Sequence, residues 1–145
     1  MVRKEDRGEG KFDTLTKALR LASYTTDITD NKKGIHTRSR KKLQKRIVSL
    51  AWSIYHRARI ANDIRVENAD DLMERRKLQN QAIAECDQLL TAIQIAKRVF
   101  HLRLKRVKYW GEMVEELKNI EKDGGSQMQI ASERSIKHKI RDVGC

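Results

Sequence analysis

The side chains that most often carry catalysis or bind metals are few in this sequence and widely spaced. The four histidines are not placed four residues apart, the spacing at which a helix presents two metal ligands: His36, His56, His101 and His138. Glycine-rich phosphate-binding loops and the G-x-S-x-G nucleophile motif are both absent from the sequence. We therefore expect a protein that is not an enzyme and that holds no metal and no cofactor.

Three remaining candidates for chemistry have simpler structural interpretations. Cys86 falls among the apolar positions of its segment, which favours a small core residue over a nucleophile. Asp70 and Asp71 stand where a helix is expected to begin, so they suit capping and the helix dipole better than acid–base catalysis. Glu133 and His138 are five residues apart, which does not fit a Glu-x-x-His di-iron motif.

Basic residues carry the strongest signal, with a formal net charge of +12 at pH 7. Residues 31–62 contain ten basic and no acidic residues, and residues 97–110 contain six basic and none acidic. One such block often forms an ordinary solvated helix face, but two blocks separated by acidic segments favour a polyanionic partner. We predict nucleic-acid contacts for Arg38, Arg40, Lys41, Lys42, Lys45, Arg46, His56, Arg57, Arg59, Lys97, Arg98, Arg103, Lys105, Arg106 and Lys108.

Trp52 lies within the first basic block and has two alternative interpretations. The helical periodicity places it on the face opposite the apolar stripe, flanked by Val48 and Tyr55. A tryptophan there needs a partner: another helix, another subunit or a stacked base. We favour an oligomer interface formed by Val48, Trp52 and Tyr55, and retain stacking of Trp52 and His56 on an unpaired base as the alternative.

These residues must be positioned by helices, because the sequence has no proline and only 7 glycines. Apolar residues recur with helical periodicity over residues 12–29, 37–65, 71–98 and 105–122. In the first segment the expected stripe is Phe12, Leu15, Ala18, Leu19, Ala22 and Thr26. Arg75 and Gln79 stand at the edge of the third stripe, and a buried Arg75 would need a carboxylate across the bundle.

Four amphipathic helices with short links predict an all-α fold, an antiparallel up-down-up-down four-helix bundle. Glycines at 124 and 125 suggest that the fourth helix ends there. We expect a flexible N-terminus over residues 1–11, the bundle over residues 12–123, and a mobile basic tail over residues 124–145. In this topology the first and third links lie at the same end, so the two basic blocks should merge into one basic pole.

Length and composition exclude several classes of protein. A chain of 145 residues indicates one domain with its own core. With 39% hydrophobic and 36% charged residues it is too apolar for a disordered chain. No apolar run approaches the roughly 20 residues of a membrane helix, and the first ten residues do not resemble a secretory signal. We expect a cytoplasmic protein with no membrane partner.

Several sequence patterns resemble a known family. Residues 75–90 read RRKLQNQAIAECDQLL, preceded by Ala61-Asn62-Asp63-Ile64 and followed by Tyr109-Trp110 and Met113-Val114. These patterns are similar to the accessory variability determinant (Avd) proteins of diversity-generating retroelements, a four-helix-bundle family related to the proteins encoded in ribosomal-RNA intervening sequences. The resemblance covers residues 12–122 and involves helix-surface patterns rather than catalytic motifs.

The resemblance implies a homopentameric ring of four-helix bundles that performs no chemistry itself. It also implies binding to the element's reverse transcriptase, to its template RNA and to the cDNA, in support of mutagenic cDNA synthesis. Two other functions remain open at this point: a stand-alone basic helical protein that binds RNA or DNA, and a structural adaptor that joins acidic proteins.

Overall fold

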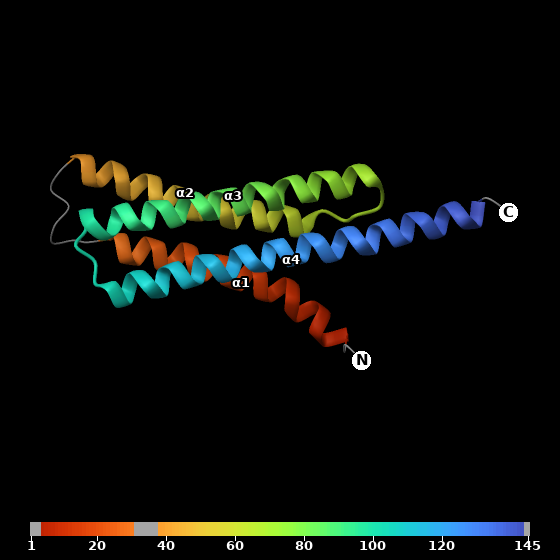
Figure 1. Ribbon diagram of the computed structural model, residues 1–145, viewed down its shortest axis with the longest axis horizontal. Helices are drawn as coiled ribbons and strands as arrows, with labels where there is room; N and C mark the ends of the chain where they lie inside the picture. The colour runs from red at the N-terminus through yellow and green to blue at the C-terminus, as the bar shows by residue number, and fades with distance from the viewer. Residues whose placement is uncertain (1–3, 31–37, 144–145) are drawn as a thin grey trace.

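The computed structural model describes residues 4–30 and 38–143, with side chains over residues 13–30 and 38–124. The described residues form four helices and no strand: α1 (Lys4–Thr29), α2 (Arg38–Asp63), α3 (Ala69–Val99) and α4 (Leu104–Val143). Helix α2 packs against α1 and α3, and α4 packs against α3 and α1 (Figure 1). The all-helical prediction is confirmed.

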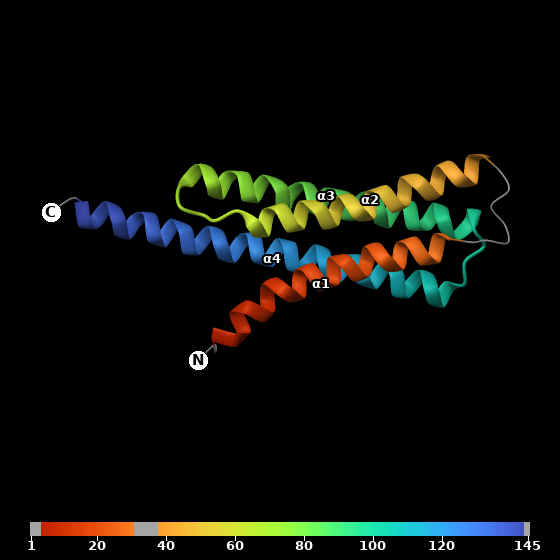
Figure 2. The same cartoon turned by 180° about the vertical axis from the view of Figure 1, so that it is seen from behind.

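The two basic blocks approach each other because of the order in which the helices run. Figure 1 and the opposite view in Figure 2 both place the end of α1, the start of α2, the end of α3 and the start of α4 at one end of the molecule. The link between α2 and α3 lies toward the other end. Helix α4 extends beyond the other helices there, and the first turns of α1 diverge from the bundle.

The outer limits of the first and fourth helices differ from the prediction. Helix α4 does not end at Gly124 but continues to Val143, and α1 begins at Lys4 rather than Phe12. A glycine within a helix costs only about 1 kcal/mol relative to alanine, so two glycines do not by themselves end a long helix. The flexibility expected for residues 1–11 and 124–145 stays a prediction.

Local hydrogen bonds define the two described links. Asn68 caps α3, since its side-chain Oδ1 accepts from the Asp71 amide at 2.8 Å. After α3, His101 adopts a left-handed conformation with φ of 51°, and the Leu102 amide donates back to the Lys97 carbonyl at 3.2 Å. This is the helix-ending arrangement that most often uses glycine, and it turns the chain into α4 within four residues.

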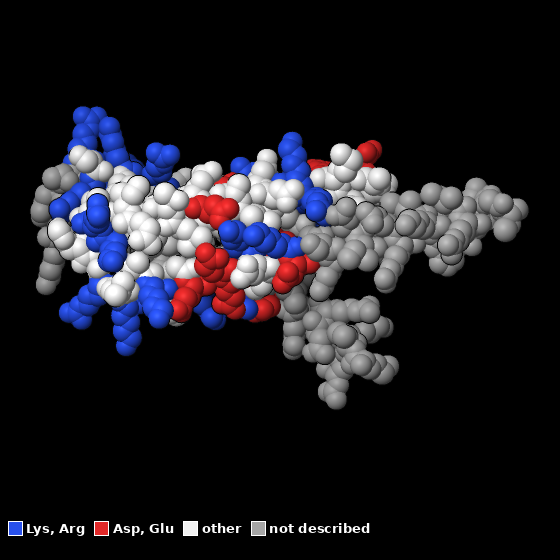
Figure 3. All heavy atoms as spheres, viewed as in Figure 1, with Lys and Arg blue, Asp and Glu red and all other residues white. Residues whose placement is uncertain are grey.

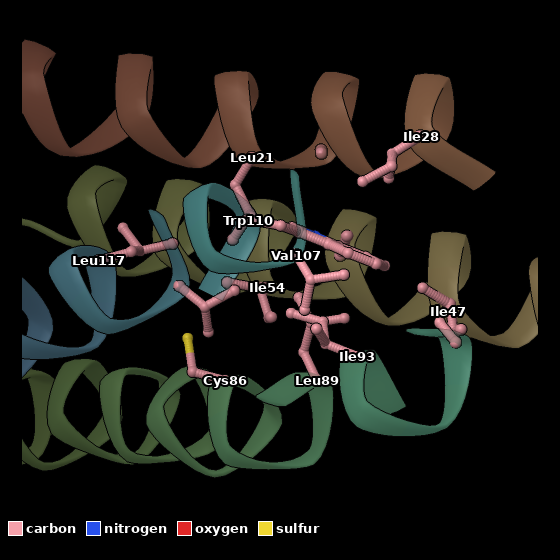
Figure 4. Close-up of a cluster of buried hydrophobic side chains, with 14 of the residues drawn as sticks. Leu21, Ile28, Ile47, Ile54, Cys86, Leu89, Ile93, Val107, Trp110 and Leu117 are labelled. Atoms are coloured by element: carbon pink, nitrogen blue, oxygen red, sulfur yellow. The ribbon is translucent and has the colours of Figure 1, made fainter. Parts of the chain in front are cut away.

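The core surrounds Trp110, the largest fully buried side chain of the described residues (Figure 4). Its indole Nε1–H donates to Oγ1 of Thr25 at 2.9 Å, and both side chains are completely buried. The helical periodicity predicted over residues 37–65 and 105–122 is confirmed, because apolar residues at that spacing are buried: Ile47, Ala51, Ile54, Ala58 and Ala61 on α2, and Val107, Trp110, Val114 and Leu117 on α4.

The stripe predicted for the first helix is only partly correct. Leu19 is 44% exposed, whereas residues outside the predicted stripe are buried, namely Leu21, Thr25, Ile28 and Thr29. The buried face of α1 is rotated by roughly 80° from the prediction, at 100° per residue. The hydroxyl of Thr25 satisfies the Trp110 indole, and hydrophobic periodicity does not register that pairing.

Arg75 is buried on α3, and its charge partner is Glu121, a buried residue of α4. A carboxylate across the bundle therefore acts on Arg75 through its charge, whereas a direct ion pair between the two stays a prediction. Burial raises the pKa of the Glu121 carboxyl to about 7, and the positive charge of Arg75 offsets only part of that effect. Burial likewise lowers the pKa of Arg75, and its Nε has no hydrogen-bond partner among the described residues.

The Trp110–Thr25 hydrogen bond is tested by Thr25→Val, which keeps the shape of the side chain and removes the acceptor. We expect a loss of about 1–3 kcal/mol in the free energy of unfolding, because a buried indole N–H loses its partner. Urea denaturation followed by circular dichroism measures it. The matched control is Thr26→Val, since Thr26 accepts from the half-buried Trp52 at 3.3 Å, where water can replace it. Equal effects of the two variants would contradict the assignment.

The Glu121 carboxyl predicts how stability depends on pH. The folded-state pKa lies above the ordinary value of 4.5, so the folded protein holds an extra proton between pH 4.5 and about 7. Stability from this group is therefore full below pH 4.5 and is lost as the pH rises through 7. Glu121→Gln should raise the free energy of unfolding by about 2–3 kcal/mol at pH 8 and leave it unchanged at pH 4.5. Glu112→Gln, at an exposed position, is the control.

Candidate nucleic-acid interface

One end of the bundle carries a dense group of basic side chains, which we call the basic pole. Figure 3 shows lysine and arginine side chains gathered at the end where α2 and α4 begin. The basic pole comprises residues at the start of α2, the end of α3 and the start of α4: Arg38, Arg40, Lys41, Lys42, Lys45, Arg46, Lys97, Arg98, Arg103, Lys105, Arg106 and Lys108. The two blocks that are separate in sequence therefore meet in space.

Most of these side chains point into solvent. All are exposed except Arg40 and Lys97, which are half-buried. The ion pairs formed by Lys17, Arg57, Arg65 and Lys118 all lie outside the basic pole. Two carboxylates, those of Asp27 and Asp30, lie near it in a groove that also includes Arg103 and Arg106. The pole thus presents a strong positive field at short range.

The charges of the pole are placed against the helix dipoles. Neither α2 nor α4 has an acidic residue in its first turn, where negative charge would stabilise the helix. Arg38 and Lys105 instead add positive charge at the positive ends of two helices, at a cost of about 0.3–1 kcal/mol each. This arrangement is poor for stability, but it is suited to an anion, because exposed helix N-termini also donate N–H groups to phosphate.

Three residues predicted to join the nucleic-acid surface do not lie at the pole. Arg59 is 18 residues beyond Lys41 on the same helix, about 27 Å along the axis. His56 and Arg57 lie near Arg59, toward the far half of α2. Arg57 forms an ion pair with Glu85 of α3 and donates to Gln81 Oε1 at 2.6 Å. An intramolecular carboxylate already neutralises this half-buried guanidinium, and its contact with nucleic acid stays a prediction.

The position predicted for Trp52 is also corrected. Trp52 does not lie opposite the core but packs against it, together with Tyr55, which meets the indole edge-on at 6.0 Å between ring centroids. The Trp52 Nε1–H donates to Thr26 Oγ1 of α1 at 3.3 Å. Of the three partners considered for Trp52, a neighbouring helix is the one present here. Val48 is half-buried beside it, and the oligomer interface of Val48, Trp52 and Tyr55 stays a prediction.

One aromatic side chain beside the pole was not among the residues predicted to contact nucleic acid. Tyr109 is 49% exposed, and it lies one turn after Arg106 on α4. Its ring meets Tyr24 of α1 edge-on, with centroids 5.2 Å apart and an interplanar angle of 76°. The spacing of Tyr109 from Arg106 and its place outside the apolar stripe are visible in the sequence, but the support from Tyr24 is not.

Three other features were looked for among the described residues: a reactive cysteine, a metal site and a membrane-spanning helix. Burial raises the pKa of the Cys86 thiol to about 12, so it stays protonated, consistent with the predicted core role. Among the described side chains no group of three histidine, cysteine or carboxylate residues is placed to hold a metal ion. In the same part of the chain, no helix combines the length and the apolar character that crossing a membrane demands.

The description of the basic pole uses no information from related proteins. Comparisons with protein families, with curated proteins and with solved structures find no match for this chain. The resemblance to the Avd family therefore rests on the residues that carry it. The basic pole rests on the placement of the helices.

The pole is tested by charge reversal in a matched pair of variants. Lys41, Lys45 and Arg103 changed together to Glu should weaken RNA binding at least tenfold, and three lost phosphate contacts should flatten the log–log salt slope by about 2–3. Fluorescence anisotropy with a labelled RNA over a salt series measures both. The control changes Arg59, Arg65 and Lys77 to Glu, which alters the net charge equally at exposed positions away from the pole. Equal weakening by the two triple variants would show that only net charge matters.

Proposed function

We propose that this protein is a non-catalytic accessory protein of a diversity-generating retroelement, which binds the template RNA and the reverse transcriptase. The basic pole supports the RNA-binding part most directly, because its charges lie where they oppose helix stability and face solvent. The resemblance of residues 75–90, 61–64 and 109–114 to Avd proteins supports the polymerase partner. In this proposal the bundle is antiparallel, up-down-up-down.

The proposed role needs no reacting group on this chain. A basic surface that holds template RNA beside a polymerase raises the local concentration of one for the other. Such tethering increases the yield of templated cDNA while the polymerase performs all the chemistry. The protein would therefore accelerate the reaction only in the presence of both partners.

The proposed contacts with other subunits and with the polymerase require protein surface outside the basic pole. A groove of about 700 Å³ runs between α2 and α3, and its apolar lining includes Leu43, Leu50 and Ile95. Ile95 is 49% exposed, and such an apolar surface supports contact with another protein. We propose a homopentamer with the polymerase bound to it, as in the family that the sequence resembles.

Reconstitution with purified components tests the proposal. We expect the reverse transcriptase of the same element to make little templated cDNA from its RNA alone and much more when this protein is added. Primer extension on a sequencing gel measures the product. The triple variant of the pole, Lys41, Lys45 and Arg103 to Glu, should lose this stimulation, whereas the triple variant of Arg59, Arg65 and Lys77 to Glu should retain it.

The same experiment separates the other candidate functions. RNA binding without any effect on the polymerase would favour a stand-alone nucleic-acid-binding protein. Binding of protein partners that is insensitive to salt, with no RNA binding, would favour an adaptor. A polymerase, nuclease or nucleotide-hydrolysing activity that disappears on mutating residues of this chain would contradict a non-catalytic role.

A further inference from the structure

Tyr109 is an exposed aromatic ring whose orientation is held by another helix. The ring is 49% exposed although it lies directly before Trp110, the centre of the core. Tyr24 meets it edge-on from α1, with centroids 5.2 Å apart. The Tyr24 hydroxyl in turn reaches the Arg106 carbonyl of α4 at 3.4 Å. A supported ring loses little conformational freedom when a ligand stacks on it.

The charges around Tyr109 are positive on one side of the ring and mixed on the other. Lys105 and Arg106, one turn earlier on α4, belong to the basic pole. On the other side, the ring borders a small groove between α1 and α4, with Arg20 and Glu112 in its lining. Lys17 and Glu116 also line this groove, but they neutralise each other in an ion pair of 2.6 Å.

This pattern orients a nucleic-acid strand. Phosphates are attracted to Lys105 and Arg106, whereas Arg20 and Glu112 in the groove offset each other, so the backbone is expected to follow the pole side of the ring. An unpaired base that turns inward from that backbone meets the face of Tyr109. A base within a duplex is already stacked and paired, so it does not reach the ring without an unstacking cost.

We propose that Tyr109 is a stacking platform for an unpaired nucleobase, and that it makes the basic pole prefer single-stranded nucleic acid over duplex. This inference rests on the proposed nucleic-acid binding of the pole and specifies which form of nucleic acid the pole takes. Stacking on an aromatic ring tolerates any base, because every base has a π face. The platform therefore selects unpaired bases rather than a sequence.

Binding of three labelled probes tests the inference: an unstructured oligouridylate RNA, its DNA equivalent and a blunt RNA duplex of equal length. Tyr109→Leu should weaken binding of both single strands about 5- to 150-fold, as expected for one lost stack. It should leave duplex binding and the salt slope unchanged, because no phosphate contact is lost. Tyr109→Phe keeps the ring and should bind all three probes as the native protein does.

A second readout distinguishes stacking from a merely structural role. A 2-aminopurine placed in the RNA strand should lose fluorescence on binding to the native protein and to Tyr109→Phe, but not to Tyr109→Leu, with circular dichroism showing that each variant is folded. Equal loss of single-strand and duplex binding by Tyr109→Leu would overturn the inference, as would single-strand binding that does not change. The inference would also be overturned if Tyr109→Leu weakened binding of single-stranded RNA but not of single-stranded DNA, because a ring that stacks on bases does not contact the 2′-hydroxyl.

The outcomes keep this inference separate from the proposed function. If the native protein binds none of the three probes, the nucleic-acid function itself fails. If it binds all of them and Tyr109→Leu does the same, the function stands and the stacking platform is wrong. If Tyr109→Leu instead loses the ability to bind the reverse transcriptase while retaining its RNA affinity, the ring is a protein contact and the inference is wrong.

Discussion

The buried hydrogen bond from Trp110 to Thr25 is the contact on which the arrangement of this bundle depends. An indole N–H is a donor only, and when it is fully buried it must find an acceptor within the protein. Thr25 supplies that acceptor from α1 at 2.9 Å, so α1 must present a threonine to the core. This requirement selects which face of α1 is buried.

The same requirement aligns the neighbours of both residues. Tyr24, one position before Thr25, meets Tyr109, one position before Trp110. Thr26, one position after Thr25, accepts from Trp52 of α2. Three successive residues of α1 therefore contact three aromatic side chains on two helices. The exposed ring beside the basic pole and the half-buried indole of α2 are both consequences of one buried polar contact.

Basic side chains have different surroundings at the two ends of the bundle. At the basic pole, positive side chains lie at the starts of α2 and α4 without acidic residues in those first turns, which costs stability. In the far half of the molecule two arginines lie near a carboxylate of a neighbouring helix: Arg75 is buried near Glu121, and Arg57 pairs with Glu85. Those carboxylates offset the two positive charges, whereas most charges at the pole remain directed to solvent. This division is the physical basis for assigning ligand binding to the pole.

The sequence by itself determined the features that depend on local pattern. Periodic apolar residues established four helices and the buried centres of α2 and α4, and Asp70 and Asp71 marked a helix start. The clusters of lysine and arginine defined two basic blocks. The short links between helices predicted an up-down-up-down topology, in which the two blocks lie at the same end of the bundle. Glycine content, a weak local signal, placed the end of α4 too early, because the cost of two glycines is small against the helix on either side.

Only the tertiary structure decided what depends on a partner from another helix. The rotation of α1, the contact of Trp52 with Thr26 and the ion pair that withdraws Arg57 from the basic surface all involve residues distant in sequence. The same holds for the pKa of Glu121, which burial between helices raises. Hydrophobic periodicity records which side chains avoid water, but it does not record which hydroxyl or carboxylate will satisfy a buried polar group. That choice is made when the helices pack, because an unsatisfied donor or charge in the core costs more than a rotation of the helix that satisfies it.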